Sequence, residues 1–154
     1  MFDKHMETSI EIAASPQRVW RELTSFGQYG TWSRFVESIQ GEPRLGARLT
    51  VKLDDGGGAM IIKPTVITLR ENEELCWEGK LGASFVFAGQ HYFKLIGQPD
   101  GYTRFVHGER FRGALVPALW SRLNTRTRTG FERFNEALRD RAESTVANVR
   151  PSVP

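Results

Sequence analysis

The stretch PALWSRLNTRTRTGFERFNEALRDRAE, residues 117–143, predicts one long C-terminal helix around which the rest of the chain is organised. Pro117 suits a first helical turn, because its missing N–H is not needed there and its φ is already helical. At about 1.5 Å per residue the helix would be roughly 40 Å long, enough to cross a small domain. Spacings of three and four place one stripe of residues on a single face: Leu119, Leu123, Thr127, Phe131, Phe134 and Leu138.

The middle of this stripe differs from its ends. Asn124, Thr127 and Gly130 are small or polar, whereas a helix that only sealed a core would carry larger apolar groups there. One interpretation is a local polar patch or a loose helical turn. The other is a helix anchored at both ends that arches over an internal cavity.

Length and composition limit the class of protein. The chain has 154 residues, 40% hydrophobic and 25% charged, which is ordinary for a globular domain with a sizeable core. A net charge of +3 without blocks of like charge argues against nucleic-acid binding. The lone Cys76 excludes an internal disulfide. Membrane insertion is not expected, because no apolar run is long enough, and the start of the chain lacks a signal-peptide core, which favours the cytoplasm.

The remaining elements precede the long helix. Residues 6–13 alternate weakly and predict a first strand. Ser15 and Pro16 then form the start of a short helix, and a second helical turn is expected over residues 25–29. The period then switches to two, which predicts about six more antiparallel strands. The clearest lie over 47–53, 60–69 (with Pro64 at a bulge or edge), 75–81, 84–96 and 102–113.

These elements predict an α+β fold in which an antiparallel sheet curls around the C-terminal helix, the only element long enough to cover its apolar face. Residues 1–143 form the single domain in this prediction. Residues 144–154 hold two prolines and no apolar period, and are expected to form a disordered tail.

The last two strands carry the most informative side chains. Their odd positions form an apolar inner face that also holds His91, His107 and Glu109. If the hairpin closes symmetrically about Pro99, His91 opposes His107 and Gly89 opposes Glu109. Two histidines and a carboxylate then converge on an aromatic wall.

Three interpretations of this convergence remain open. The groups could satisfy one another or a helix residue such as Asn124 or Thr127, since unpaired buried polar groups cost about 1–3 kcal/mol each. They could anchor a ligand in an apolar pocket, or do general acid–base work. A metal site is weakly indicated and is not predicted, and no nucleotide-binding motif is present, so no cofactor is predicted. Cys76 has no neighbouring base and is expected to be inert.

Several motifs resemble the START-like SRPBCC superfamily in its polyketide cyclase/dehydrase branch. They are Ile10-x-Ile12-x-Ala14-Ser15-Pro16-x-x-Val19-Trp20 with Trp32, Leu75-x-Trp77-x-Gly79, Thr103-Arg104-x-x-His107-x-Glu109-x-Phe111-x-Gly113, and Phe131, Asn135, Leu138 and Glu143. The resemblance covers roughly residues 6–143. It implies the helix-grip fold, a seven-stranded antiparallel sheet around one long helix with two short helices after the first strand and a deep hydrophobic cavity. Members bind lipids, sterols or polyketides, and some are cyclases or aromatases; they share no single catalytic set, so none is carried over.

The leading hypothesis is therefore a protein that binds a hydrophobic or aromatic small molecule, lipid- or polyketide-like, in the cavity between sheet and helix. His91, His107 and Glu109 would orient its polar end, and the wall would be Trp32, Phe35, Trp77, Phe85, Phe93, Phe105 and Phe111 with Leu123, Thr127 and Phe131. Whether the protein is an enzyme stays open. The first alternative is a polyketide cyclase or dehydratase with His107 or Glu109 as catalytic base. The second is a protein-interaction or chaperone-accessory module, which predicts an apolar surface patch and a small or filled cavity. An exposed sheet edge is compatible with a homodimer.

Overall fold

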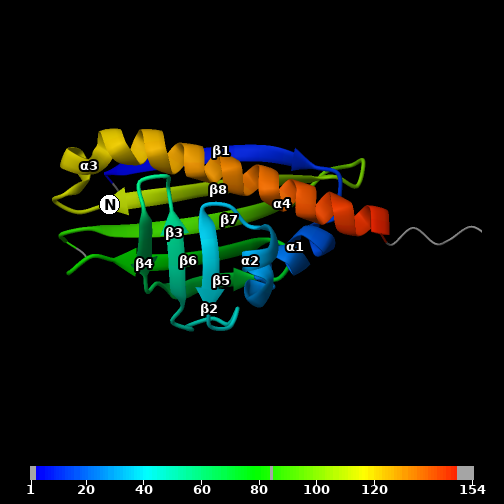
Figure 1. Ribbon diagram of the computed structural model, residues 1–154, viewed down its shortest axis with the longest axis horizontal. Coiled ribbons are helices and arrows are strands. Elements are labelled where there is room, and N and C mark those ends of the chain that lie inside the picture. The colour runs from blue at the N-terminus through cyan, green and yellow to red at the C-terminus, as the bar shows by residue number, and fades with distance from the viewer. Residues whose placement is uncertain (1–2, 84, 149–154) are drawn as a thin grey trace, which may run out of the picture.

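A computed structural model describes residues 3–83 and 85–148 as a long helix lying across a strongly curved antiparallel sheet (Figure 1). The eight strands fall into two sheets, in the orders β1-β8-β7-β6-β5 and β2-β3-β4. Their bounds are β1 Lys4–Ile12, β2 Val36–Gln40, β3 Thr50–Asp54, β4 Ala59–Ile62, β5 Thr65–Arg70, β6 Glu74–Lys80, β7 Ala88–Gly97 and β8 Thr103–Arg112.

The seven-stranded sheet expected from the sequence is thus wrong in its strand count, and Pro64 supplies the reason. The single strand expected over residues 60–69 is broken at Lys63 and Pro64 into β4 and β5. Proline has no N–H to donate to a ladder, so the chain bends there and each half joins a different sheet. The sheets stay linked, because Leu49 N–H donates to the Pro64 carbonyl at 2.8 Å and Val66 N–H to the Ala47 carbonyl at 2.9 Å.

Three short helical elements follow β1, where the sequence predicts two. Helix α1 (Pro16–Thr24) begins with Ser15, whose side chain accepts a hydrogen bond from the Arg18 N–H, and Pro16 occupies its first turn. A 3₁₀ turn η1 (Phe26–Gln28) and the short α2 (Tyr29–Trp32) come next.

The C-terminal helix is not one uninterrupted α-helix. Helix α3 (Val116–Arg122) passes into a π-helical turn η2 (Leu123–Thr127) and then into α4 (Arg128–Asn148). The π-turn covers most of the small and polar stretch that stood out in the sequence. Because α4 continues to Asn148, residues 144–148 are helical rather than part of a disordered tail; the rest of the expected tail, residues 149–154, lies outside the described residues.

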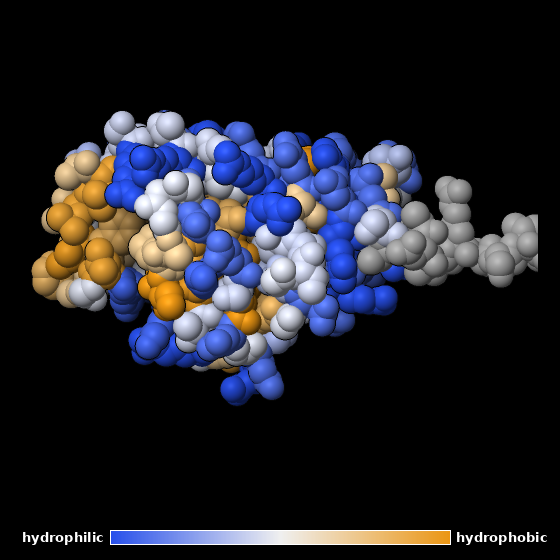
Figure 2. Space-filling view, viewed as in Figure 1, coloured by the Kyte–Doolittle hydropathy of each residue, from blue (hydrophilic) through white to orange (hydrophobic). Residues whose placement is uncertain are grey.

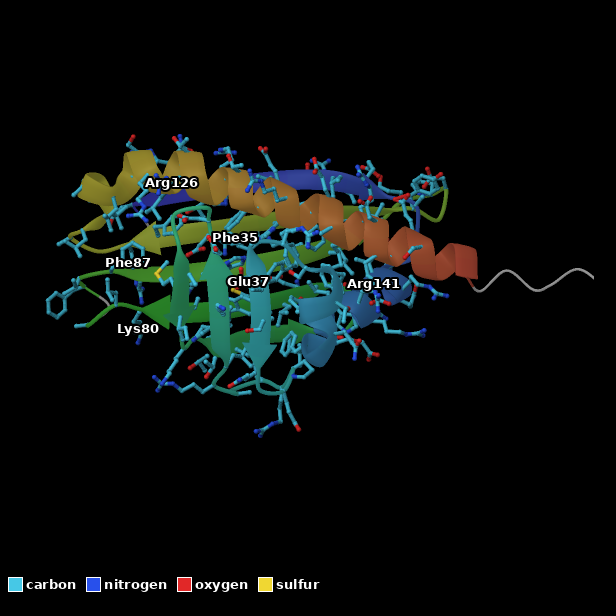
Figure 3. The ribbon with its side chains drawn as sticks, in the orientation of Figure 1. Phe35, Glu37, Lys80, Phe87, Arg126 and Arg141 are labelled. Carbon is cyan, nitrogen blue, oxygen red and sulfur yellow. The ribbon has the colours of Figure 1, made fainter. Side chains whose placement is uncertain are left out.

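Gly130 explains how α4 approaches the β2 side of the fold. A Cβ on Gly130 would collide with the ring of Phe35, which itself sits at φ +70°, an unusual value for a non-glycine residue. Figure 3 shows Phe35 beside the helix, at the entry to β2. The glycine therefore serves close packing here.

The register of the last hairpin differs by two residues from the expected one. His91 pairs with Glu109, and Phe93 pairs with His107. The reason is the loop: the ladder ends at the Gly97–Thr103 pair, so the turn is centred on Asp100 and not on Pro99. The Asp100 side chain accepts a hydrogen bond from the Tyr102 N–H at 2.9 Å and stabilises this centre.

Candidate functional site

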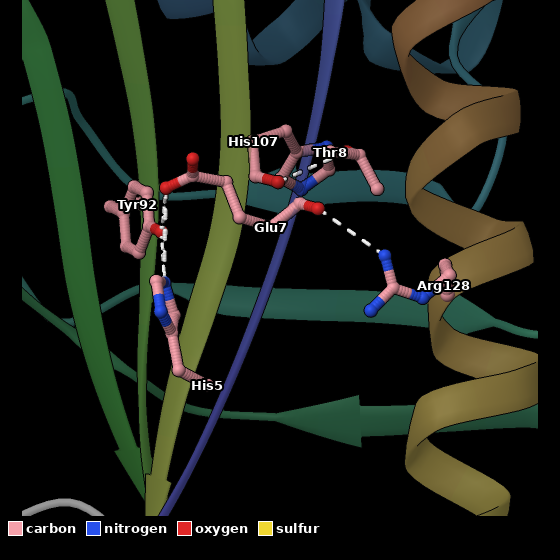
Figure 4. A network of polar contacts seen from close by, with 6 residues as sticks. All are labelled: His5, Glu7, Thr8, Tyr92, His107 and Arg128. Carbon is pink, nitrogen blue, oxygen red and sulfur yellow. Dashed lines mark hydrogen bonds and ion pairs between the residues drawn. The ribbon is translucent and has the colours of Figure 1, made fainter.

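A chain of hydrogen bonds crosses the core from β7–β8 to α4 and β1. His91 Nδ1 lies 3.2 Å from Glu109 Oε1, and His91 Nε2 lies 2.6 Å from His107 Nε2. His107 Nδ1 lies 2.8 Å from Asn135 Oδ1, and the Asn135 amide donates to Thr8 Oγ1 at 2.9 Å. Thr8 in turn donates to the His107 carbonyl at 3.0 Å. Figure 4 shows this last hydrogen bond of the chain, between β1 and β8. We call this the buried relay; it consists of Glu109, His91, His107, Asn135 and Thr8.

Donor and acceptor counting assigns the protons of the buried relay. The Asn135 amide nitrogen donates to Thr8. The Asn135 oxygen carries no proton, so it must accept a hydrogen bond from His107 Nδ1–H. His107 Nε2 is then an acceptor for His91 Nε2–H, which leaves His91 Nδ1 without a proton. The Glu109 carboxyl, whose Oε1 lies 3.2 Å from that nitrogen, is therefore placed to donate its own proton to His91 Nδ1. Every member is satisfied with both imidazoles neutral and the carboxyl protonated.

Burial favours the same protonation state. It raises the pKa of Glu109 to about 8 and lowers the pKa of His91 to about 3. The pKa of His107 is lowered well below its usual value, first by burial and then by the proximity of His91, against the opposing effect of its hydrogen bond with Asn135. A neutral relay is therefore the form expected near neutral pH.

Glu109 is the end of the relay that meets solvent. Its side chain keeps 17% of its accessible surface, whereas that of His91 keeps 4%. Gly89, on the neighbouring strand, makes room for it, since a Cβ there would collide with the carboxylate. Glu109 thus lies at the boundary between the packed core and the end of the sheet.

Three aromatic rings pack together at the end of the sheet that lies beyond Glu109. Phe111, two residues further along the same face of β8, lies 6.0 Å from Phe87 and 6.2 Å from Trp120 between ring centroids. Phe87 and Trp120 are only partly buried. We call Phe87, Phe111 and Trp120 the end cluster, and Figure 3 shows Phe87 at the end of the sheet near Lys80.

Several of the residues predicted to line a cavity pack against aromatic neighbours. Trp77 and Phe93 are 5.2 Å apart between centroids, Phe35 and Phe131 5.6 Å, and Trp32 and Phe134 5.6 Å. His107 stacks on Phe131 at 3.9 Å with 9° between the planes. Phe105 and Phe111 are buried as well, Leu123 and Thr127 lie half-buried in η2, and Phe85 is 76% exposed.

Two surface hollows, of about 360 and 650 Å³, stand out on the described part of the chain. One lies between the β5–β6 turn and the last residues of β7, and the other lies along α4 beside Trp32; neither is lined by a residue of the buried relay. None of the described helices has the length and apolar character needed to cross a bilayer. Within residues 3–83 and 85–148, no cluster of three or more metal-ligating side chains occurs.

The sequence prediction identified the three titratable members of the relay and missed the other two. It named Asn124 or Thr127 as helix partners, whereas the partner is Asn135, one turn after Phe131 on the buried face. A polar residue at that position of an apolar stripe was the available signal. No such signal marked Thr8 in the sequence, because the alternation of polar and apolar residues along β1 is weak.

A second polar group, on the outer face of the sheet, was also not foreseen. Tyr92 Oη donates to Glu7 Oε2 at 2.6 Å and lies 2.5 Å from His5 Nε2, which joins β7 to β1 across β8 (Figure 4). Cys76 is buried on this face with Tyr92 and Val106, and burial raises the pKa of its thiol to about 12. The thiol is therefore protonated and unreactive at neutral pH.

Comparisons with known proteins agree with this architecture. An aromatase/cyclase from Streptomyces sp. R1128 is 18% identical over 97% of this chain and 99% of its own, with a TM-score of 0.73. A START superfamily protein from Mycobacterium smegmatis is 16% identical over 92% and 98%, with a TM-score of 0.74. A norcoclaurine synthase point mutant from Thalictrum flavum, in complex with a transition-state analogue, is 12% identical over 93% and 96%, with a TM-score of 0.71.

At these identities the solved structures establish the fold. No curated protein matches the sequence. The family model described as polyketide cyclase/dehydrase and lipid transport matches residues 3–143. Together with the helix-grip architecture, this match shows that the chain belongs to the polyketide cyclase/dehydrase and lipid transport family of the START-like SRPBCC superfamily.

Proposed function

We propose that the protein binds a small hydrophobic or aromatic molecule between two rings of the end cluster, Phe87 and Phe111, and the α3–η2 segment that carries Trp120, with the Glu109 carboxyl at the molecule's polar end. The observation that carries this proposal is the largely buried carboxyl of Glu109, 3.2 Å from His91 Nδ1 and two residues before Phe111, which packs against the partly buried rings of Phe87 and Trp120. Its second oxygen is free to accept a hydrogen bond from a ligand hydroxyl.

Weak anchoring of α3 and η2 supports entry of a ligand at this place. In α3 only Val116 is buried, and no residue of η2 is. In α4, by contrast, Phe131, Phe134 and Leu138 are fully buried. Residues with few buried contacts open at lower free energy than the core. The segment 116–127 is therefore the part of the helix that can move away to admit a molecule.

A polar contact also bears on this movement. Arg126 reaches from η2 to the β3–β4 turn, where a Cβ on Gly57 would collide with its guanidinium (Figure 3). Long, exposed arginine side chains hold such positions weakly. Opening the segment would then break few interactions.

Two probes test the binding site, 2-naphthol and naphthalene, which differ by one hydroxyl. We expect 2-naphthol to bind about fivefold more tightly by calorimetry, since one net hydrogen bond is worth roughly 1 kcal/mol. Glu109→Leu should abolish that difference, while Glu109→Gln, which keeps a carbonyl acceptor, should retain it. Glu132→Leu, at an exposed position of α4, is the matched control. Equal affinities of the wild type for both probes, or no binding of either, would contradict the proposal.

Hydrogen exchange tests the moving segment separately. Amides of residues 116–127 should exchange faster than those of α4 in the free protein and slow when 2-naphthol is added. Slowing in α4 alone would place the probe elsewhere.

A dehydratase or cyclase activity is the second candidate, and the relay favours it. The Glu109 proton could pass to the hydroxyl that leaves a β-hydroxyketone as water, and the resulting carboxylate could take the proton from the α-carbon, whose C–H electron pair forms the new C=C bond. With 4-hydroxy-4-phenylbutan-2-one as substrate, formation of the conjugated enone is followed by absorbance. Glu109→Gln should abolish turnover and still bind 2-naphthol; turnover that survives this change would rule out the role.

The interaction-module alternative also finds support, because the apolar surface that it predicts is present in the described residues. Large apolar side chains are exposed at one end of the molecule.

A further inference from the structure

We propose that the end of the molecule formed by the β6–β7 and β8–α3 loops docks on the surface of an anionic lipid bilayer. Leu81, Phe85 and Leu115, here called the apolar rim, are 61%, 76% and 40% exposed. Figure 2 shows hydrophobic surface gathered at this end, where Figure 1 places α3 and the neighbouring loops. This proposal goes beyond small-molecule binding and does not require it.

The two loops form one platform. The Ala114 N–H donates to the Phe85 carbonyl at 2.9 Å, and the Leu115 N–H donates to the Val86 carbonyl at 3.1 Å. The Leu81 N–H donates to the Phe87 carbonyl at 3.0 Å. These backbone groups are satisfied before any partner arrives, so apolar side chains can enter the headgroup boundary without exposing bare amides to it. They also offer no row of unpaired amides to an added protein strand.

Charge complementarity selects an anionic lipid surface as the occupant. Residues 79–87 and 110–126 include Lys80, Arg110, Arg112, Arg122 and Arg126 and contain no Asp or Glu. Two of these cations share one carboxylate, since Glu78 lies 3.9 Å from Lys80 and 3.8 Å from Arg112, so the five cations outnumber the acidic group paired with them. An apolar tip with cations around it matches the headgroup region of an anionic leaflet.

The test is co-sedimentation with vesicles of phosphatidylcholine containing about one third phosphatidylglycerol, beside pure phosphatidylcholine vesicles. We expect binding to the mixed vesicles, weakened by salt, and at least about tenfold weaker partitioning for the double variant Phe85→Ser/Leu115→Ser. The control is Ile67→Ser/Ile96→Ser, which removes two similarly exposed apolar side chains, 39% and 47%, from other parts of the surface. The control should bind like the wild type.

Three outcomes would overturn the proposal. The wild type could fail to sediment with either kind of vesicle. The rim variant could bind as well as the control. Light scattering could show a dimer that the rim variant dissociates, which would assign the apolar rim to a second copy of the chain. Circular dichroism of both double variants establishes that they are folded before the vesicles are added.

Discussion

His91 Nδ1 lies 3.2 Å from Glu109 Oε1, directly across the β7–β8 ladder, and this contact fixes the protonation state of the whole buried relay. A glutamate beside a histidine is usually read as an ion pair. Here the second nitrogen of His91 must donate to His107, so the proton between His91 and Glu109 belongs to the carboxyl. Removing both charges avoids the cost of burying them in a low-dielectric core.

This assignment predicts how stability depends on pH. Glu109 binds its proton more tightly in the folded protein, where its pKa is about 8, than in the unfolded chain, where it is 4.5. Its contribution to folding stability is therefore fully present below pH 4.5 and is lost as pH rises to 8. The effect of His91 on stability has the opposite sign. Its pKa is about 3 in the folded protein and 6.5 in the unfolded chain, so stability is lost as pH falls below 6.5. From these two groups stability is nearly constant between pH 4.5 and 6.5, where their opposite effects cancel, and falls by about 1–2 kcal/mol between pH 6.5 and 8.

Urea unfolding at pH 6.5 and pH 8 measures this difference. Glu109→Gln keeps a donor to His91 and cannot ionise, so the decrease above pH 6.5 should disappear, while the exposed Glu132→Gln should behave like the wild type. If the pair were ionic, Glu109→Gln would be strongly destabilised already at pH 6.5.

The imidazole tautomers are a second expected outcome. ¹⁵N NMR of the side chains should show His107 protonated on Nδ1 and His91 protonated on Nε2 at pH 7. Asn135→Leu removes the acceptor for His107 and the donor to Thr8, and should cost about 1–3 kcal/mol in the free energy of unfolding. An imidazolium signal at either histidine would contradict the neutral relay.

Sequence reasoning succeeded where a strong period or a special residue determines structure. The period of the C-terminal stretch predicted a helix, Ser15 and Pro16 predicted the start of α1, and Pro64 marked the irregular position that divides β4 from β5. It failed in the helix middle, because a π-turn has no propensity signature, although its small and polar residues were noticed.

The three titratable members of the buried relay were named from the sequence, but its geometry was not predicted. A loop centred on Asp100 rather than Pro99 moves each pair by two residues, which keeps every side chain on the same face but brings Glu109 opposite His91. Whether inner aromatic rings enclose space or fill it depends on how closely the helix approaches. Here Gly130 permits contact with Phe35, and a single glycine does not reveal that in a sequence.

Gly130 gives a third prediction, in which packing overrides helix propensity. Alanine is favoured over glycine in a helix interior by about 1 kcal/mol, yet Gly130→Ala places a Cβ against the Phe35 ring and should destabilise the protein by about 1–3 kcal/mol. Gly30→Ala in α2 meets nothing within 4 Å and is the matched control, expected to be neutral or stabilising. Urea midpoints compare the two, and a more stable Gly130→Ala variant would show that α4 can shift away from Phe35.

The outer face gives the last prediction, because Tyr92 can reach Glu7 on β1 only by crossing Gly108 on β8. Gly108 is the cross-strand partner of both residues, and a Cβ on it would collide with the Tyr92 ring and lie 2.7 Å from the Met6 carbonyl oxygen. Gly108→Ala should therefore cost about 1–3 kcal/mol in unfolding free energy. Tyr92→Phe should cost about 1 kcal/mol, since the exposed partners His5 and Glu7 regain water.

Gly79→Ala in β6 controls for the effect of adding a methyl group to a strand glycine, because its nearest neighbour, the Pro64 Cβ, lies at an ordinary 3.8 Å. Thermal unfolding of the three variants should rank Gly79→Ala as the most stable and Gly108→Ala as the least. Since alanine is otherwise at least as good as glycine in a strand, equal stability of the two alanine variants would mean that Tyr92 does not lie across Gly108. The tie between β1 and β7 would then have to pass around β8 by another path.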